Sequence, residues 1–289
     1  MDNRPIGIFD SGVGGLTVAK EMIDILPEEN IIYFGDTARF PYGTKTDVEL
    51  EGFVVEIVRF LQEEDVKLIV IACNSASAAA LKMAQELFSI PIIGVIEPSA
   101  QGAAEATRNR RVGVIGTRAT ISSRAYEEAI HCFDAGIEIF PRVCRQFADF
   151  VENGELDGAH VSETGRRYLD PLLSAGIDTL VLGCTHYPLL TGLIDRLMGG
   201  NVALISSAIE TARETKRILD RRNQLRTEAG SPNYRFISTG DADKFLNLGS
   251  RFLGREIDIV DKVVLPDAVL LPASLREGLS QEKAKKAVL

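Results

Sequence analysis

Short apolar runs rich in Val and Ile alternate along the chain with longer segments in which apolar residues recur every three or four positions. Eight short runs have the length of buried strands: 6–9, 30–34, 68–72, 92–95, 112–115, 137–140, 179–182 and 202–205. Helical spacing is clearest in three longer segments: 16–26, 53–61 and 209–220. Strands that are apolar on both faces are typical of parallel sheets covered by helices on both sides. The pattern therefore predicts a doubly wound α/β fold.

The two halves of the chain resemble each other. The run Gly7-Ile8-Phe9-Asp10-Ser11 is similar to Gly113-Val114-Ile115-Gly116-Thr117, and Cys73 and Cys184 end matching apolar runs at nearly the same separation. We therefore predict two similar parallel-sheet domains related by a pseudo-twofold axis, with the active site in the cleft between them.

The domain boundaries are predicted from the same repeat. Residues 1–97 and 208–289 are assigned to a discontinuous first domain, and residues 98–207 to the second. The polar end of the chain, 276–289, is expected to form a surface helix or a frayed tail.

Composition narrows the class of protein. The 289 residues are 45% hydrophobic and 25% charged, as in soluble globular proteins, and the net charge is −9. With this acidity and no basic stripe, nucleic-acid binding is not expected as the main activity. The longest uncharged stretch, 179–194, is shorter than the roughly 20 residues that span a bilayer, and no signal segment opens the chain. We expect a cytoplasmic protein, without a membrane partner, whose cysteines are thiols.

Two of the four cysteines lie where chemistry is expected. Cys73 and Cys184 each end a predicted strand and are followed by small polar residues. The carboxyl ends of parallel strands face the crevice in which α/β proteins bind ligands. Two thiols, one from each half, suggest an acid and a base on opposite sides of one substrate. Cys132 and Cys144 lie in helical patterns and are interpreted as core residues. A metal site at Cys184 is less favoured, because the chain has no CxxC pair and only three histidines.

Two further segments are candidates for ligand contact. The turn Asp10-Ser11-Gly12-Val13-Gly14-Gly15 follows the first strand but lacks both phosphate-binding glycine patterns, so a tight strand-to-helix turn is an equally good interpretation. Asp10 favours a ligand-facing role, because it ends the strand. The loop 33–43 concentrates aromatic, acidic and basic residues, which is more than a connection requires, although a structural loop remains an alternative.

Taken together, the motifs resemble those of glutamate racemases, in the aspartate/glutamate racemase superfamily. The resemblance covers about residues 5–260 and rests on five motifs: 9–15, Gly35-Asp36, Pro41-Tyr42-Gly43, Ala72-Cys73-Asn74-Ser75-Ala76-Ser77 and Gly183-Cys184-Thr185-His186-Tyr187-Pro188. Ser75 stands where the family usually has Thr, and it keeps the hydroxyl. The resemblance implies inversion of the α-carbon of glutamate by a thiolate and a thiol, without cofactor or metal. It also implies a homodimer that supplies D-glutamate for peptidoglycan in a bacterial cytoplasm.

The resemblance also assigns roles to residues. Asp10 would assist Cys73, and His186 would assist Cys184. The family pattern adds Asp36 and Glu152 as acids, although an ordinary helix-end carboxylate is an equal interpretation for Glu152. The expected substrate-binding residues are Asp10, Ser11, Pro41, Tyr42, Gly43, Asn74, Ser75, Thr117, Thr120, Thr185 and His186. Most of them offer a hydroxyl, an amide, a carboxylate or a backbone N–H group.

Three alternatives remain open. A sister racemase acting on aspartate or another amino acid would share the two thiols. A two-domain amino-acid-binding module would close on its ligand without chemistry. A hydrolase with Cys184 as nucleophile and His186 as base would need only one thiol.

Overall fold

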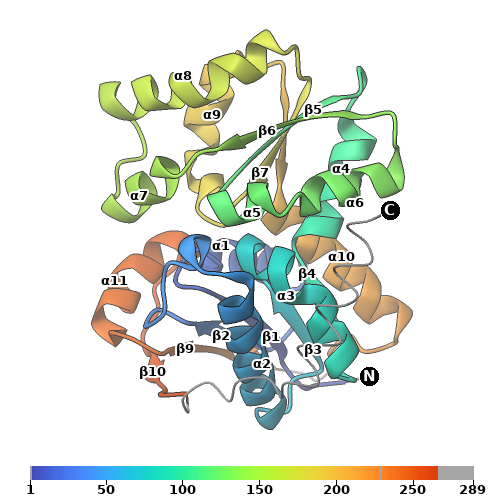
Figure 1. Cartoon of the computed structure of the whole chain (residues 1–289). Coiled ribbons are helices and arrows are strands. Elements are labelled where there is room, and N and C mark those ends of the chain that lie inside the picture. Colours follow the sequence, from blue (N-terminus) through green and yellow to red (C-terminus); the bar gives the residue numbers. More distant parts are fainter. Residues whose placement is uncertain (1, 228–229, 266–289) are drawn as a thin grey trace.

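The computed structural model describes residues 2–227 and 230–265, and the predicted helix or tail at 276–289 lies outside them. Two α/β units lie one above the other, each built around a parallel sheet (Figure 1). The first sheet has the order β10-β9-β2-β1-β3-β4, and its strands are β1 Ile6–Asp10, β2 Ile31–Gly35, β3 Leu68–Ile71, β4 Ile92–Gly94, β9 Tyr234–Ser238 and β10 Asp261–Lys262. The second has the order β6-β5-β7-β8, and its strands are β5 Arg111–Gly116, β6 Glu138–Val143, β7 Thr179–Gly183 and β8 Ala203–Ser206.

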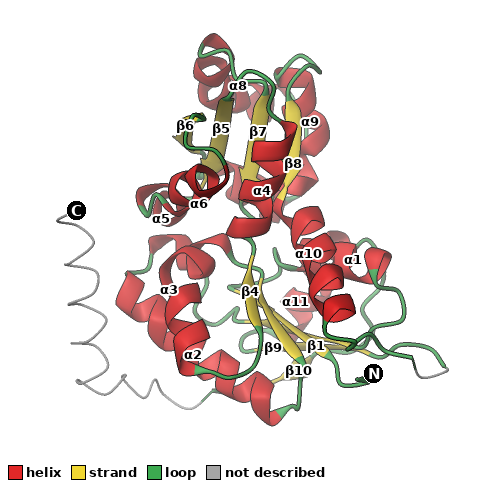
Figure 2. Cartoon of the chain, turned by 90° about the vertical axis from the view of Figure 1, so that its right-hand side faces the viewer, coloured by secondary structure: helices red, strands yellow, loops and turns green. Residues whose placement is uncertain are grey.

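Helices cover both sheets (Figure 2). Those that follow strands of the first sheet are α1 Leu16–Ile25, the 3₁₀ turn η1 Tyr42–Thr44, α2 Asp47–Glu63, α3 Asn74–Leu87 and α11 Ala242–Leu253. The second sheet is accompanied by α5 Arg118–Ser122, α6 Ala125–Phe133, α7 Gln146–Asn153, α8 Ala159–Ser174, the 3₁₀ turn η2 Tyr187–Leu190 and α9 Thr191–Leu197. Two helices, α4 Ile96–Ala106 and α10 Ser207–Arg221, begin at the predicted domain boundaries. Both contact β7 and β8, while α10 also packs on α1 and α4 also contacts α3. The units are thus joined by two packed helices, and the boundaries themselves stay a prediction.

The two sheets repeat one topology. The order β2-β1-β3-β4 corresponds to β6-β5-β7-β8, and all pairs are parallel. All eight predicted strands are present, within one to three residues at their ends. Alternate residues of β1 belong to different apolar clusters, Ile6 and Ile8 to one and Phe9 to the other, so both faces of the sheet are buried. The structure therefore confirms a doubly wound α/β fold with two similar parallel-sheet units.

The interpretation of the other two cysteines needs correction. Cys132 lies in α6, as predicted, but it is exposed, because that helix turns Tyr126 and Ile130 toward the core and Cys132 away from it. Cys144 is buried, as predicted, yet it follows β6 rather than lying in a helix. The strand continues through Pro141 to Val143, where the apolar pattern alone had suggested an earlier end.

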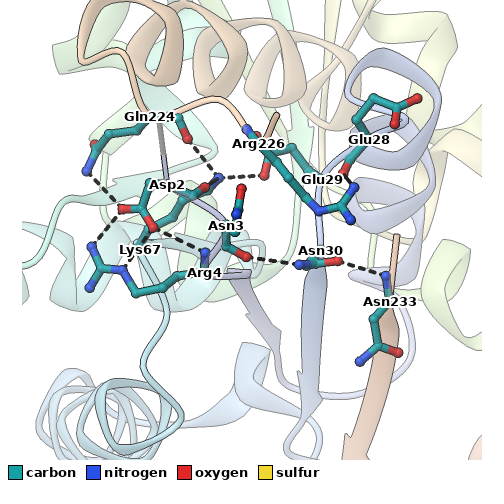
Figure 3. Close-up of polar contacts among 10 residues, drawn as sticks. All are labelled: Asp2, Asn3, Arg4, Glu28, Glu29, Asn30, Lys67, Gln224, Arg226 and Asn233. Atoms are coloured by element: carbon teal, nitrogen blue, oxygen red, sulfur yellow. Dashed lines mark hydrogen bonds and ion pairs between the residues drawn. The ribbon is translucent and has the colours of Figure 1, made fainter. Parts of the chain in front are cut away.

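A buried ion pair between Lys67 and Glu29 lies at the amino ends of strands β2 and β3 of the first sheet (Figure 3). The Lys67 ammonium group donates to Glu29 Oε2 at 2.6 Å and to the backbone oxygens of Asp2 at 2.7 Å and Gln224 at 2.8 Å. The other Glu29 oxygen accepts the backbone N–H of Arg226 at 2.8 Å. The network joins the start of the chain to the segment between α10 and β9. Removing either partner would leave the other charge buried and unpaired, which typically costs about 3–5 kcal/mol, so Lys67 and Glu29 depend on each other.

Candidate active site

A cavity of about 340 Å³ lies between the two units. Its walls come from the loops that follow β1, β2 and β3 in one unit and β5 and β7 in the other, so the carboxyl ends of both sheets face it. Most of the residues predicted from the sequence line it: Ser11, Pro41, Tyr42, Gly43, Cys73, Asn74, Ser75, Thr117, Cys184, Thr185 and His186. Asp10, Asp36, Thr120 and Glu152 are not among the residues that line this cavity.

Cys73 stands at the junction between β3 and α3, as the residue that precedes the helix. It is 7% exposed, and its Sγ lies 3.9 Å from Ser11 Oγ. Burial raises the pKa of the Cys73 thiol, and the nearby Asp10 carboxyl raises it further. Cys73 therefore favours the protonated thiol form.

Asp10 is a fully buried carboxyl at the end of β1. Its Oδ2 accepts the backbone N–H groups of Gly12 at 3.2 Å and Gly15 at 3.0 Å, whereas Oδ1 has no hydrogen-bond partner in the described part of the chain. Burial raises the pKa of Asp10, and it outweighs the opposing effects of His186 and the backbone donors. A carboxyl with a raised pKa and a free oxygen is suited to take a proton from a neighbouring group.

Cys184 follows β7 and is also 7% exposed. Its Sγ lies 3.7 Å from His186 Nδ1, and Nε2 of the same ring lies 3.1 Å from Glu152 Oε1. Burial lowers the pKa of His186, but the contacts with Cys184 and Glu152 together raise it to about 10. The ring is therefore an imidazolium at neutral pH and places a positive charge beside the sulfur of Cys184. The structure brings these three predicted residues into one chain of contacts.

The start of α3 brings polar groups to the cavity. Asn74 Oδ1 accepts the hydroxyl of Tyr126 at 2.7 Å, while its Nδ2 is buried and has no partner among the described residues. Ser75 Oγ lies 3.0 Å from Thr117 Oγ1 and 3.3 Å from Thr120 Oγ1, and the two threonine hydroxyls lie 3.1 Å apart. A free amide, three hydroxyls and the backbone N–H groups of a helix start are suited to binding a carboxylate.

Asp36 is fully buried behind the cavity wall. It accepts hydrogen bonds from Arg39 Nε at 2.6 Å, from Thr239 Oγ1 at 2.8 Å and from the hydroxyl of Tyr42. Tyr42 itself lines the cavity. The contacts of Asp36 therefore hold the loop that carries Tyr42, and none of them reaches the cavity.

The glycine-rich turn after β1 is required by close packing between the units. A Cβ on Gly14 would lie 2.5 Å from Thr185 Oγ1 and 2.6 Å from His186 Cε1. Nearby, Thr17 Oγ1 donates to the backbone oxygen of Thr185 at 2.9 Å. The turn thus supports the loop that carries Cys184, and this contact accounts for the glycine without a phosphate.

Sequence reasoning missed several groups at the cavity. Arg118, Arg145 and Asp149 are exposed and line it, although each lies outside the recognised motifs. Tyr126 reaches the site from the second unit through its contact with Asn74. Nothing in the local sequence around these residues differs from an ordinary helix surface or core position, so only the tertiary structure identifies them.

The chain is similar to known racemases. The model of the Asp/Glu/Hydantoin racemase family matches residues 7–215. The chain belongs to this family. It is 49% identical over 276 residues to the glutamate racemase of Beutenbergia cavernae, covering 91% of this chain and 94% of that protein. It is also 49% identical over 266 residues to the glutamate racemase of Mycobacterium leprae, covering 92% and 97%.

Solved structures of glutamate racemases share the fold of this racemase. Isoform RacE1 from Bacillus anthracis has a TM-score of 0.88 at 45% identity, covering 92% of this chain and 99% of that one. The enzyme from Francisella tularensis in complex with D-glutamate has a TM-score of 0.85 at 39% identity, covering 91% and 98%. These similarities show that the chain is an enzyme of the racemase class, an isomerase.

The described residues, 2–227 and 230–265, lack two further classes of feature. No helix there is long and apolar enough to cross a membrane. No group of three or more His, Cys, Asp or Glu residues there could hold a metal ion. The sulfur of Cys184 instead has an imidazole neighbour, which suits proton transfer.

Proposed function

We propose that this racemase interconverts L- and D-glutamate with Cys73 and Cys184 as the two acid–base groups, without cofactor or metal. The observation that carries the proposal is that both thiols line one cavity, one from each unit. Removal of an α-proton and its return on the opposite face require two such groups on opposite sides of the α-carbon. Similarity to glutamate racemases, one of them solved with D-glutamate, supports glutamate as the substrate.

The proton transfers follow from the charges around the two sulfurs. In one direction the Cys184 thiolate takes the α-proton, so that the C–H bond breaks, an S–H bond forms and the electron pair stays on the substrate. The Cys73 thiol then gives its proton to the opposite face of the α-carbon. Its S–H bond breaks, the electron pair on the substrate forms the new C–H bond, and Cys73 is left as a thiolate. In the other direction the roles are exchanged. The His186 imidazolium and the raised pKa of Cys73 support the first of these starting states.

Neighbouring groups would assist each sulfur. Asp10, with its free oxygen and raised pKa, would take the proton of Cys73 when that residue acts as the base. The His186 imidazolium, held by Glu152, would instead stabilise a Cys184 thiolate through its positive charge. We assign Asp36 a positioning role, because its contacts end on the cavity loop rather than in the cavity.

Substrate binding is assigned to the polar groups of the cavity wall. The start of α3 and the hydroxyl cluster would hold one carboxylate. Ser11, Tyr42, Gly43 and Thr185 offer further donors on the remaining walls. Aligned donors in a site of low water content stabilise the negative charge that develops when the α-proton leaves.

The test is proton NMR of L-glutamate with the purified protein in D₂O and no added cofactor. Loss of the α-proton signal, with optical rotation falling to zero and no effect of a chelator, is the expected result. Exchange with aspartate but not glutamate would favour a sister racemase. Binding without exchange that survives loss of either thiol would favour a binding module. Hydrolysis that persists in Cys73→Ala would favour a one-thiol hydrolase.

We also infer that the enzyme supplies D-glutamate for peptidoglycan in a bacterial cytoplasm, which the bacterial glutamate racemases among its relatives support. Loss of the gene product should then be rescued by D-glutamate in the medium. The homodimer and the boundaries at residues 97 and 207 stay predictions. Sedimentation and limited proteolysis, respectively, would check them.

A further inference from the structure

The amide of Asn74 has only one of its two ends satisfied by the protein. Its Oδ1 accepts a hydrogen bond at 2.7 Å from Tyr126, whereas its Nδ2 is buried without a partner in the described residues. Asn74 is 3% exposed and lines the cavity. A buried N–H donor without an acceptor is unfavourable unless a ligand supplies one. The free end of this amide therefore suits an acceptor inside the cavity, such as a carboxylate oxygen.

Tyr126 reaches Asn74 from the opposite unit. It lies at the start of α6, is 3% exposed, and belongs to the buried face of a helix that packs on α4. Burial raises the pKa of Tyr126, so the phenol keeps its proton at neutral pH. A phenol hydroxyl can both donate and accept, and here it donates to Asn74 Oδ1, which leaves the amide nitrogen as the end without a partner.

We propose that Tyr126 is a positioning residue that fixes the orientation of the Asn74 amide and turns its NH₂ group toward the substrate carboxylate. The inference rests on the proposed function, because it takes the substrate to be an amino acid held by a carboxylate. An amide that loses this donor is free to turn over. The Asn74 amide then presents its oxygen to the cavity. This oxygen and the substrate carboxylate are both hydrogen-bond acceptors, so no hydrogen bond forms between them.

The first test is Tyr126→Phe, which removes the hydroxyl and keeps the ring. We expect KM for glutamate to rise about three- to tenfold, the effect of weakening one hydrogen bond to a charged group, with kcat changed by less than about twofold. Tyr168→Phe is the matched control, because the Tyr168 hydroxyl also donates to a side-chain amide oxygen, that of Gln146 at 3.1 Å, away from the cavity. Its KM should equal that of the wild type. Equal KM in both variants and the wild type would overturn the proposal.

A double-mutant cycle separates positioning from general packing. Asn74→Ala should raise KM at least as much as Tyr126→Phe. Once the amide is gone, adding Tyr126→Phe should change KM no further, because the two residues act through one contact. If the two effects instead multiply, Tyr126 acts on the cavity in some other way and the proposal is wrong.

A spectroscopic measurement makes the test independent of the substrate. The side-chain NH₂ signals of Asn74 can be assigned in a ¹H–¹⁵N spectrum by their absence in Asn74→Ala. They should shift in Tyr126→Phe and stay in place in Tyr168→Phe. Unchanged signals in Tyr126→Phe would overturn the positioning role even if glutamate is racemised. A shift in an enzyme that does not racemise glutamate would contradict the proposed function alone.

Discussion

Cys73 and Cys184 occupy equivalent places in the two units but have opposite charges beside them. Each follows the third strand of the repeated order, β3 or β7, and each is 7% exposed. Next to Cys73 is the Asp10 carboxyl, with burial and negative charge raising the pKa of the thiol. Next to Cys184 is the His186 ring, whose pKa is raised to about 10.

The different neighbours of the two cysteines show how two similar units can serve the proposed reaction, in which the two directions interconvert mirror-image substrates. The repeat places both sulfurs at one cavity, one from each unit and equally exposed. The residues beside them then differ: burial and the Asp10 carboxyl raise the pKa of Cys73, whereas the His186 ring, whose own pKa is raised to about 10, lies beside Cys184. The repeated topology sets where the two sulfurs lie. Residues that differ between the two units set the charge beside each sulfur.

The largest effect is expected from removing either sulfur. Cys73→Ser and Cys184→Ser should each lower kcat by a factor of about 10² to 10⁴, the contribution of a general acid or base, because a serine hydroxyl is a much weaker acid than a thiol. Circular dichroism should show an unchanged fold. Turnover near the wild-type rate in either variant would contradict the two-base mechanism.

The next effect tests the difference between the two sulfurs. His186→Asn and Asp10→Asn should each lower kcat by roughly 10- to 100-fold, in the lower range of acid–base assistance. Enantiomers have equal free energy, so kcat/KM must fall equally in both directions. The asymmetry should instead appear in the isotope effect of α-deuterated substrate. His186→Asn should raise it for the enantiomer that Cys184 deprotonates, and Asp10→Asn for the other.

If the isotope effects for the two enantiomers are equal in both variants, His186 and Asp10 do not assist different sulfurs. The two residues would then act on substrate binding rather than on separate proton transfers. A change in KM without any change in the isotope effects would lead to the same conclusion.

A smaller effect concerns stability and pH. The folded-state pKa of His186, about 10, is above the value of about 6.5 expected in the unfolded chain. The stability that this protonation contributes is therefore fully present below about pH 6.5 and is lost as pH rises through about 10. Urea unfolding should show the wild type losing stability relative to His186→Asn over this range. A constant difference between the two proteins would show that the ring does not titrate as described.

Much of this comparison could be predicted from the sequence because its elements are local. A strand that ends in Cys-Asn-Ser or Cys-Thr-His is recognised from neighbouring residues, and apolar periodicity predicted the eight strands of the repeat. The local sequence pattern does not predict contacts between residues that are far apart in the chain. Tyr126 and the placement of Asp36 behind Tyr42 depend on segments far apart in the chain. The strands β9 and β10 have weaker apolar signals, and only the pairing of β9 with β2 and of β10 with β9 identifies them.

The smallest effect is expected at Glu152, which touches neither sulfur. Its contact is with His186 Nε2 at 3.1 Å, and its side chain is 25% exposed, so solvent weakens the interaction. Glu152→Gln keeps a hydrogen-bond acceptor at this position but removes the charge. We expect kcat to fall only about two- to fivefold, since one partly exposed charge contributes little more than this. The pKa of His186, followed by the NMR shift of its ring, should fall at the same time. If that pKa stays near 10 in Glu152→Gln, then Cys184 and Asp10 hold the proton on the ring without help, and Glu152 contributes nothing to the difference between the two sulfurs.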